Sequence, residues 1–437
     1  LSGSPTITLH EDKELIEKYV RIKEKESKES VPKNTAICPI EGKNLPTARI
    51  HEKIKGIRGG AATGGVLIGM KNSAFESYGK RQSYNSAMSD VAMKKYTRSL
   101  NALLADRSHN QVLGDITLIY FAVDKNDSSA CDIFSAMLYG SEDEELERSL
   151  DSVAKQIAQG KTGDLSALEV SEDAQFYVVG LAPNSARISQ KFIIRNSFGR
   201  VVQNLIEHQH DLKMRENAAQ TPIWRLTKEL VSPKSKDTVS SPLISSVFMS
   251  IINGTNYPVA LLETVIRRVR TDSDEENKPF IKMNEVRVGI IKACLNRRAR
   301  FSNQKEEITM ALDETNRNPS YLCGRLFAVL EKVQQDASGG NLNRTIKDAY
   351  FNSACVRPAT TLPKLVILSQ NHLAKLTPES KIYYSKLIGS ISSLFEGEFP
   401  TVLSLENQGR FILGYYQQNK MLYTSTKNKE VKGNAAE

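Results

Sequence analysis

Residues 48–104 read ARIHEKIKGIRGG (48–60), AATGGVLIGM (61–70), KNSAFESYGKRQSYNSAM (71–88) and SDVAMKKYTRSLNALL (89–104). Apolar residues from Val91 to Leu104 recur at three- to four-residue spacing, and Ser89 followed by Asp90 is a helix-start signal. We therefore predict a helix over 88–104. The short apolar run at 66–70 is typical of a buried strand.

The segment before that helix combines positive charge with glycine. No acidic residue occurs between Lys53 and Glu76, and glycine lets a backbone approach a ligand closely. Aromatic and amide side chains follow, and these are the groups that contact nucleic acid. The segment therefore predicts a nucleic-acid contact. The alternative is a glycine-rich loop that leads into a buried strand, with its charges simply solvated.

We assign roles within this contact by side-chain chemistry. Cations are expected to hold phosphates, whereas amides and flat rings can enter a groove or unstack a base step. Tyr78 and Phe75 are interpreted as packing residues. The predicted phosphate and polar contacts are Lys53, Lys55, Arg58, Lys71, Asn72 and Lys80, and the predicted groove contacts are Gln82, Tyr84 and Asn85.

Composition limits the class of protein. The 437 residues are 40% apolar and 25% charged, with a net charge of +9, which predicts a globular protein with an anionic partner. The five cysteines are widely spaced, which favours reduced thiols over a disulfide framework. No apolar run approaches the length of a membrane span, and no signal segment is evident, so we expect a cytoplasmic protein that contacts no membrane.

The pattern changes near residue 232. Strands are predicted at 115–123, 175–181 and 187–195 with helices between them, which indicates an α+β domain over 1–232. The segment 232–242 is rich in Ser, Lys and Pro and is predicted to be a boundary. A helical bundle is predicted over 243–424. Its expected helices are 243–252, 258–270, 283–299, 320–337, 358–375, 380–396 and 403–422.

Basic clusters recur in the helical half. Three arginines within four residues occur twice, which exceeds what helix capping requires and predicts a phosphate track, although cations at helix ends are also common dipole partners. The residues assigned to this track are Arg267, Arg268, Arg297, Arg298, Arg344 and Lys347.

The sequence carries few residues in catalytic patterns. The glycines at 56–69 lack the lysine and hydroxyl of a phosphate-binding loop. The sequence His208-Gln-His210-Asp211 leaves open a metal-dependent phosphohydrolase, which would need further ligands. We therefore expect no catalytic residue, no bound metal and no cofactor, and keep the hydrolase as the alternative.

Several long blocks resemble the large subunit of the type I-C CRISPR Cascade complex. They occur in that family's order from about residue 36 to 424. The blocks include AICPIEGKNLPTARIHEKIKGIRGG, NSAFESYGKRQSYNSAMSD, GDITLIYFAV, FYVVGLAPNSARIS, NGTNYPVALLETVIRRVR, YLCGRLFAVLEKVQ, LNRTIKDAYFNSACVRP and LENQGRFILGYYQQ.

The resemblance implies a non-enzymatic subunit of an RNA-guided ribonucleoprotein. Such a subunit would bind guide crRNA and target double-stranded DNA, recognise the protospacer-adjacent motif, and help to open the duplex and stabilise the R-loop. Sequence identity is then read by base pairing. The implied partners are the other Cascade backbone and small subunits and a helicase–nuclease. The resemblance also implies a small subunit made from an internal start, for which Met310 is the candidate here and Met283 the alternative.

Overall fold

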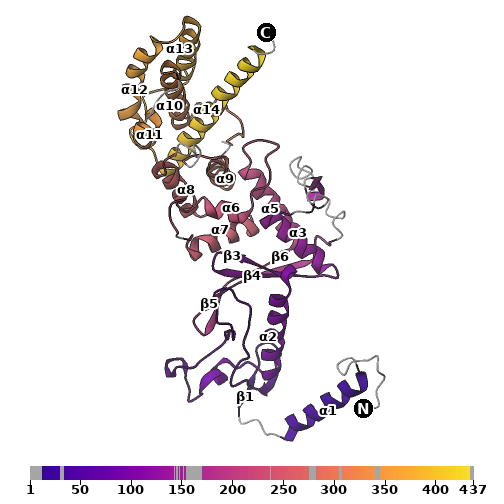
Figure 1. Cartoon of the computed structure of the whole chain (residues 1–437). Helices are drawn as coiled ribbons and strands as arrows, with labels where there is room; N and C mark the ends of the chain where they lie inside the picture. The colour runs from indigo at the N-terminus through magenta and orange to yellow at the C-terminus, as the bar shows by residue number, and fades with distance from the viewer. Residues whose placement is uncertain are drawn as a thin grey trace. The chain divides into compact units, whose positions relative to one another are not determined.

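The computed structural model describes most of the chain. The described residues are 12–29, 34–141, 143, 146, 148–150, 152–153, 170–236, 238–274, 282–304, 308–339 and 345–433. Helices predominate in them, and a small antiparallel sheet lies in the N-terminal half (Figure 1), so the predicted α+β class is confirmed.

The backbone forms two compact units. Unit 1 comprises residues 1–110 and 181–190, and unit 2 comprises residues 111–180 and 191–437. The predicted division at 232–242 differs from this one. In unit 2 the ring of Phe192 stacks on Phe248 at a centroid distance of 5.4 Å, so the same core continues on both sides of the predicted boundary.

Unit 1 is built around one amphipathic helix and several loops. The Ser89 hydroxyl accepts from the Ala92 N–H at 3.0 Å and so caps α2, as its sequence predicts. The elements are α1 (Lys13–Glu29), β1 (Thr35–Ile37) paired antiparallel with β2 (Asn44–Pro46), η1 (Ser73–Phe75), η2 (Gln82–Ser86), α2 (Asp90–Ala105) and η3 (Arg107–His109).

The strand predicted at 66–70 does not form. Val66 makes a single bridge, donating to Ala186 O at 3.2 Å and accepting from Ile188 N at 2.9 Å. Residues 67–70 continue as bends and irregular backbone, and all four are only partly buried. A short apolar run can therefore belong to a loop that forms one backbone bridge and then continues without strand pairing.

The sheet of unit 2 has the strand order β3-β4-β5-β6. Its strands are β3 (Asn110–Leu113), β4 (Ile116–Val123), β5 (Gln175–Asn184) and β6 (Arg187–Ser197). Residue 110 and the hairpin tip 181–190 are grouped with unit 1. Figure 1 shows α3 (Asp127–Tyr139), α5 (Phe198–Leu212) and α7 (Ser241–Asn253) along one face. Phe176 of β5 packs there between Phe134 of α3 and Phe198 of α5.

Helices form the rest of unit 2. Those predicted in the C-terminal half are found close to their expected bounds, and α11 was not predicted. The remaining elements are α6 (Ile223–Lys228), α8 (Val259–Thr271), α9 (Glu285–Phe301), α10 (Pro319–Ala337), α11 (Ile346–Val356), α12 (Pro358–Leu373), α13 (Pro378–Ser392) and α14 (Leu405–Gly433).

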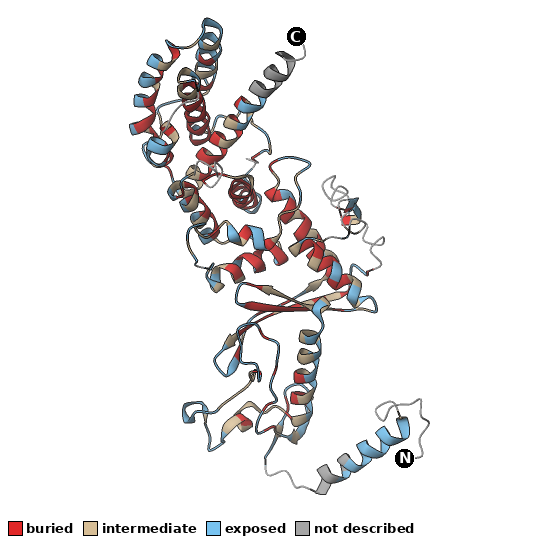
Figure 2. Cartoon of the chain, viewed as in Figure 1, coloured by how far each residue is buried: buried red, intermediate tan, exposed pale blue. Residues whose placement is uncertain are grey.

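The centre of the bundle is a close contact between α10 and α14. A Cβ added at Gly324 would lie 2.0 Å from Phe411 O, and one added at Gly414 would lie 2.2 Å from Tyr321 O. The two backbones therefore approach where each helix has no side chain. Figure 2 shows α9 and much of α10 as buried, and α9 is enclosed on every side from Val286 to Arg297.

Two further expectations concern the whole chain. All five cysteines are buried thiols without a disulfide, in agreement with the expected reduced state. Among the helices that the structure describes, none has the length and hydrophobicity to cross a bilayer.

Candidate nucleic-acid interface

The first basic loop of unit 1 is held by the helix that follows it. Asn101 of α2 accepts from the Lys55 N–H at 2.8 Å and donates to Lys53 O at 3.1 Å. Between the two lysines, Ile54 is fully buried and exchanges both backbone hydrogen bonds with Gly65, at 2.8 and 2.9 Å. The buried residue and the paired backbone fix this segment, so the flanking lysines project from a rigid support.

The first loop requires glycine at position 64, next to the residue that pairs with Ile54. Gly64 has a φ of +83°, and a Cβ there would lie 2.5 Å from Ile54 O. Any other residue would therefore disrupt the pairing of Ile54 with Gly65. The predicted contacts Lys53, Lys55 and Arg58 are all exposed, and Lys53 Nζ donates to Thr63 Oγ1 at 3.2 Å.

The second loop presents an aromatic ring to solvent. Tyr78 is 98% exposed and has a φ of 51°, in the left-handed region that L-residues rarely adopt. The turn is closed by Ser77 and Lys80, whose N–H donates to Ser77 O at 3.0 Å. The interpretation of Tyr78 as a packing residue is therefore wrong. The glycine that follows Tyr78 in the sequence was the signal that indicated a tight turn and an exposed ring.

Asn85 holds this turn in place. Its Oδ1 accepts from Ser77 N–H at 3.0 Å, and its Nδ2 donates to Lys80 O at 2.8 Å and to Gln82 O at 2.9 Å. With these bonds the amide is engaged on both sides, so Asn85 positions the turn, and its role as a groove contact stays a prediction. Gln82, whose N–H donates to Glu76 Oε1 at 3.0 Å, and Tyr84 are partly buried.

Several exposed cations lie near Tyr78 in the sequence. Lys71, Lys80 and Arg81 are exposed, as is Asn72 at the start of η1. Phe75 is 43% exposed, and the Arg187 guanidinium lies over its ring at 5.0 Å from the centroid. Unit 1 thus brings the predicted phosphate contacts onto two well-supported loops and adds Tyr78 to them.

One residue of the phosphate track predicted in the helical half, Arg297, is internal. Arg297 is 1% exposed, lies 4.2 Å over the Tyr257 ring, and donates to Ser250 O at 3.2 Å and Thr255 O at 3.1 Å. Its guanidinium also pairs with Asp211 at 3.4 Å. The assignment of Arg297 as a nucleic-acid contact is therefore corrected, because this side chain stabilises the core of unit 2.

The other members of that track differ in exposure. Arg298 pairs with Glu406, Arg268 with Asp272 at 3.3 Å, and Lys347 with Asp274 at 2.5 Å. Their charges are thus largely compensated within unit 2. Arg267 is exposed, and Arg344 lies outside the described residues.

The alternative metal site does not assemble. Arg300 donates to both oxygens of Asp211, at 2.8 and 2.6 Å, so that carboxylate is engaged by arginine. His208 is buried and hydrogen-bonded to Tyr257 OH at 2.5 Å, and burial lowers its pKa to about 3. His210 is exposed, and in the described chain these three side chains do not meet as a set of ligands. This geometry gives no support to the phosphohydrolase.

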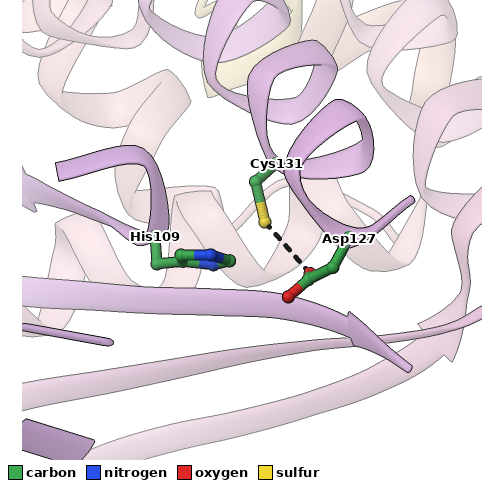
Figure 3. A group of neighbouring side chains, drawn as sticks. All are labelled: His109, Asp127 and Cys131. Carbon is green, nitrogen blue, oxygen red and sulfur yellow. Dashed lines mark hydrogen bonds between the residues drawn. The ribbon is translucent and has the colours of Figure 1, made fainter. Parts of the chain in front are cut away.

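Cys131 and Asp127, two side chains of types that can bind a metal ion, stabilise the fold. Cys131 Sγ donates to Asp127 Oδ1 at 3.5 Å, and that oxygen accepts from the Ala122 N–H at 2.6 Å (Figure 3). Burial raises the pKa of the Cys131 thiol, which favours the protonated donor. The pair thus closes the connection between β4 and α3. His109, also drawn in Figure 3, belongs to unit 1.

Comparison with known proteins shows to which family the chain belongs. No curated protein matches the sequence. Residues 2–423 match the model of a family described as CRISPR-associated protein (Cas_Csd1). That match spans nearly the whole chain, including both basic loops of unit 1 and the helices of unit 2. The chain belongs to this family of CRISPR-associated proteins.

Proposed function

We propose that this protein is the large subunit of a type I-C CRISPR interference complex. In this role it binds the guide-RNA ribonucleoprotein and target double-stranded DNA in the cytoplasm and recognises the protospacer-adjacent motif. It then helps to open the duplex, stabilises the R-loop and supports recruitment of the helicase–nuclease, without itself catalysing a reaction. Family membership supports the general assignment, and the loops of unit 1 support the contact with DNA.

The exposed turn at Tyr78 is the observation that carries the proposal. A duplex attracts lysine and arginine through its phosphates, and an inserted ring can separate two stacked base pairs. Tyr78 is the most exposed large hydrophobic side chain in the described part of unit 1, and Lys71, Lys80 and Arg81 are exposed on the same loop. The ring is therefore accessible to a duplex held by these cations.

The turn is rigid enough to act on DNA. Asn85 bonds three points of the segment 77–82, and Glu76 bonds the Gln82 N–H. A ring on a fixed support loses little conformational entropy when it inserts, which preserves binding energy for separating the bases. Lys53, Lys55 and Arg58 on the first loop would add phosphate contacts without reading sequence.

The test uses the assembled complex and a target duplex with or without its flanking motif. We expect Tyr78→Ala to weaken binding to the complete target about tenfold, since one stacked base is worth roughly 1–3 kcal/mol. Tyr78→Phe should retain most of the affinity. Fluorescence of 2-aminopurine beside the motif would report the opening of the duplex, which Tyr78→Ala should reduce.

The matched control is Tyr350→Ala, which removes a tyrosine of α11 that is 39% exposed. It should leave both affinity and opening unchanged. Wild-type opening and affinity in the Tyr78→Ala complex would refute the role assigned to this turn.

A further inference from the structure

The sheet of unit 2 has a second face with its own side-chain chemistry. Along a strand successive side chains alternate between faces, and Tyr120, Phe176 and Ile194 point to the helices. The alternate positions therefore point to the opposite face. They are Thr117, Ile119, Phe121 and Val123 of β4, Gln175, Tyr177 and Val179 of β5, and Lys191, Ile193 and Arg195 of β6.

Three flat groups form a row across this face. The rings of Phe121 and Tyr177 are nearly parallel, with an interplanar angle of 9° and centroids 5.1 Å apart. The Arg195 guanidinium continues the row at 5.8 Å from the Tyr177 centroid. Its Nε donates to Gln175 Oε1 at 2.9 Å, which holds the guanidinium beside the ring. The row is thus ordered before any ligand binds.

Thr117 and Ile119 on this face are buried, whereas its other part exposes apolar area next to positive charge. Val123 is 64% exposed and Ile193 is 55% exposed, although both lie in regular strands. Lys191 and Arg195 are exposed, and none of these ten positions, all of them described, carries a carboxylate. An exposed apolar patch with cations and flat rings suits a ligand that has both planar apolar groups and negative charge.

We propose that this face binds single-stranded RNA. Unpaired bases can lie against Phe121 and Tyr177 and the neighbouring apolar side chains, and the phosphates can pair with Lys191 and Arg195. A duplex keeps its bases stacked inside and cannot use the rings. RNA is favoured over DNA because the Tyr177 hydroxyl and the Gln175 amide can hydrogen-bond a ribose 2′-hydroxyl.

The binding assay uses the purified full chain and fluorescein-labelled ten-nucleotide oligouridine. The comparison ligands are deoxyuridine DNA of the same length and a double-stranded RNA. Tyr177→Leu should weaken RNA binding about tenfold, because it keeps apolar volume but removes stacking and the hydroxyl. A Lys191→Gln/Arg195→Gln double variant should weaken binding and reduce the salt slope by about 1.4, since two phosphate contacts are lost.

The controls replace comparable groups elsewhere in unit 2. Tyr350→Leu in α11 and Lys364→Gln in α12 should bind RNA like the wild type. Lys191 and Arg195 are exposed, so their replacement tests the face even if Tyr177→Leu fails to fold by circular dichroism. RNA affinity within twofold of wild type in the double variant would overturn the proposal. Equal affinity of the wild type for the DNA strand, weakened to the same extent by these substitutions, would also overturn the proposal.

Discussion

At the scale of single residues, exposure separates side chains of the same type. Tyr78 and Tyr84 lie six positions apart, yet the first is 98% exposed and the second is partly buried. The difference comes from the backbone, because the turn at Tyr78 has a positive φ and points its ring outward. Composition alone identified an aromatic, basic segment, but which of its rings is exposed to solvent depends on the geometry of the turn.

Arginines show the same limitation. The sequence Arg297-Arg298-Ala-Arg300 predicts a basic helix end, and the first of these residues is the most deeply buried. Because α9 is enclosed on every side from Val286 to Arg297, the Arg297 cation has to be paired internally. Asp211 forms an ion pair with Arg297 and accepts hydrogen bonds from Arg300. Local sequence contains no information about such distant partners.

The buried His208 gives a prediction about pH. Burial and the nearby Arg297 lower its pKa to about 3, from an ordinary value of 6.5. The unfolded chain therefore binds a proton between those values and the folded chain does not. The stabilisation is complete above pH 6.5 and is lost as the pH falls towards 3, by up to about 1.4 kcal/mol per pH unit.

Urea unfolding at pH 7 and pH 5 measures this effect. His208→Gln should reduce the loss of stability between the two pH values, because glutamine does not titrate and can still bond the Tyr257 hydroxyl. The control is His210→Gln, which replaces an exposed histidine of the same helix and should retain the wild-type loss. Equal losses in both variants would exclude His208 as the source.

At the scale of elements, backbone contact between α10 and α14 organises the helical bundle. Gly324→Ala would place a Cβ 2.0 Å from Phe411 O, where backbone cannot yield easily. We expect a loss of about 3 kcal/mol or more in unfolding free energy, at the upper end of overpacking effects. Thermal unfolding measures it.

The matched control is Gly389→Ala in α13, where an added Cβ meets nothing within 4 Å. Alanine favours a helix over glycine by up to about 1 kcal/mol, so this variant should be as stable as wild type or slightly more stable. Similar melting temperatures for the two variants would contradict the close helix contact.

Elements with a strong local signal were predicted well. The Ser89 cap fixes the start of α2, and the β-branched and aromatic run of β4 forms a strand where expected. The errors occur where local signals are weak. The β3 segment Asn-Gln-Val-Leu is only half apolar, yet it forms a strand because it pairs with β4. Residues 66–70 are apolar, but they lack a strand partner beyond Val66. Strand pairing is a tertiary property.

At the scale of the whole molecule, the net charge of +9 is consistent with an anionic partner but does not locate it. Several cations of the helical half are paired within unit 2, whereas Lys71 and Lys80 are exposed on unit 1. The α+β class and the family resemblance followed from long stretches of sequence. The position of the contact depends on which charges remain at the surface.

The most direct test of DNA contact by unit 1 is the salt dependence of duplex binding by the assembled complex. A Lys71→Gln/Lys80→Gln double variant should bind the target more weakly and lower the slope of log affinity against log salt by about 1.8, since two phosphate contacts are lost. The control, Lys228→Gln/Lys364→Gln, replaces two exposed lysines of unit 2 and should keep the wild-type slope. An unchanged slope and affinity in the Lys71/Lys80 variant would contradict the account.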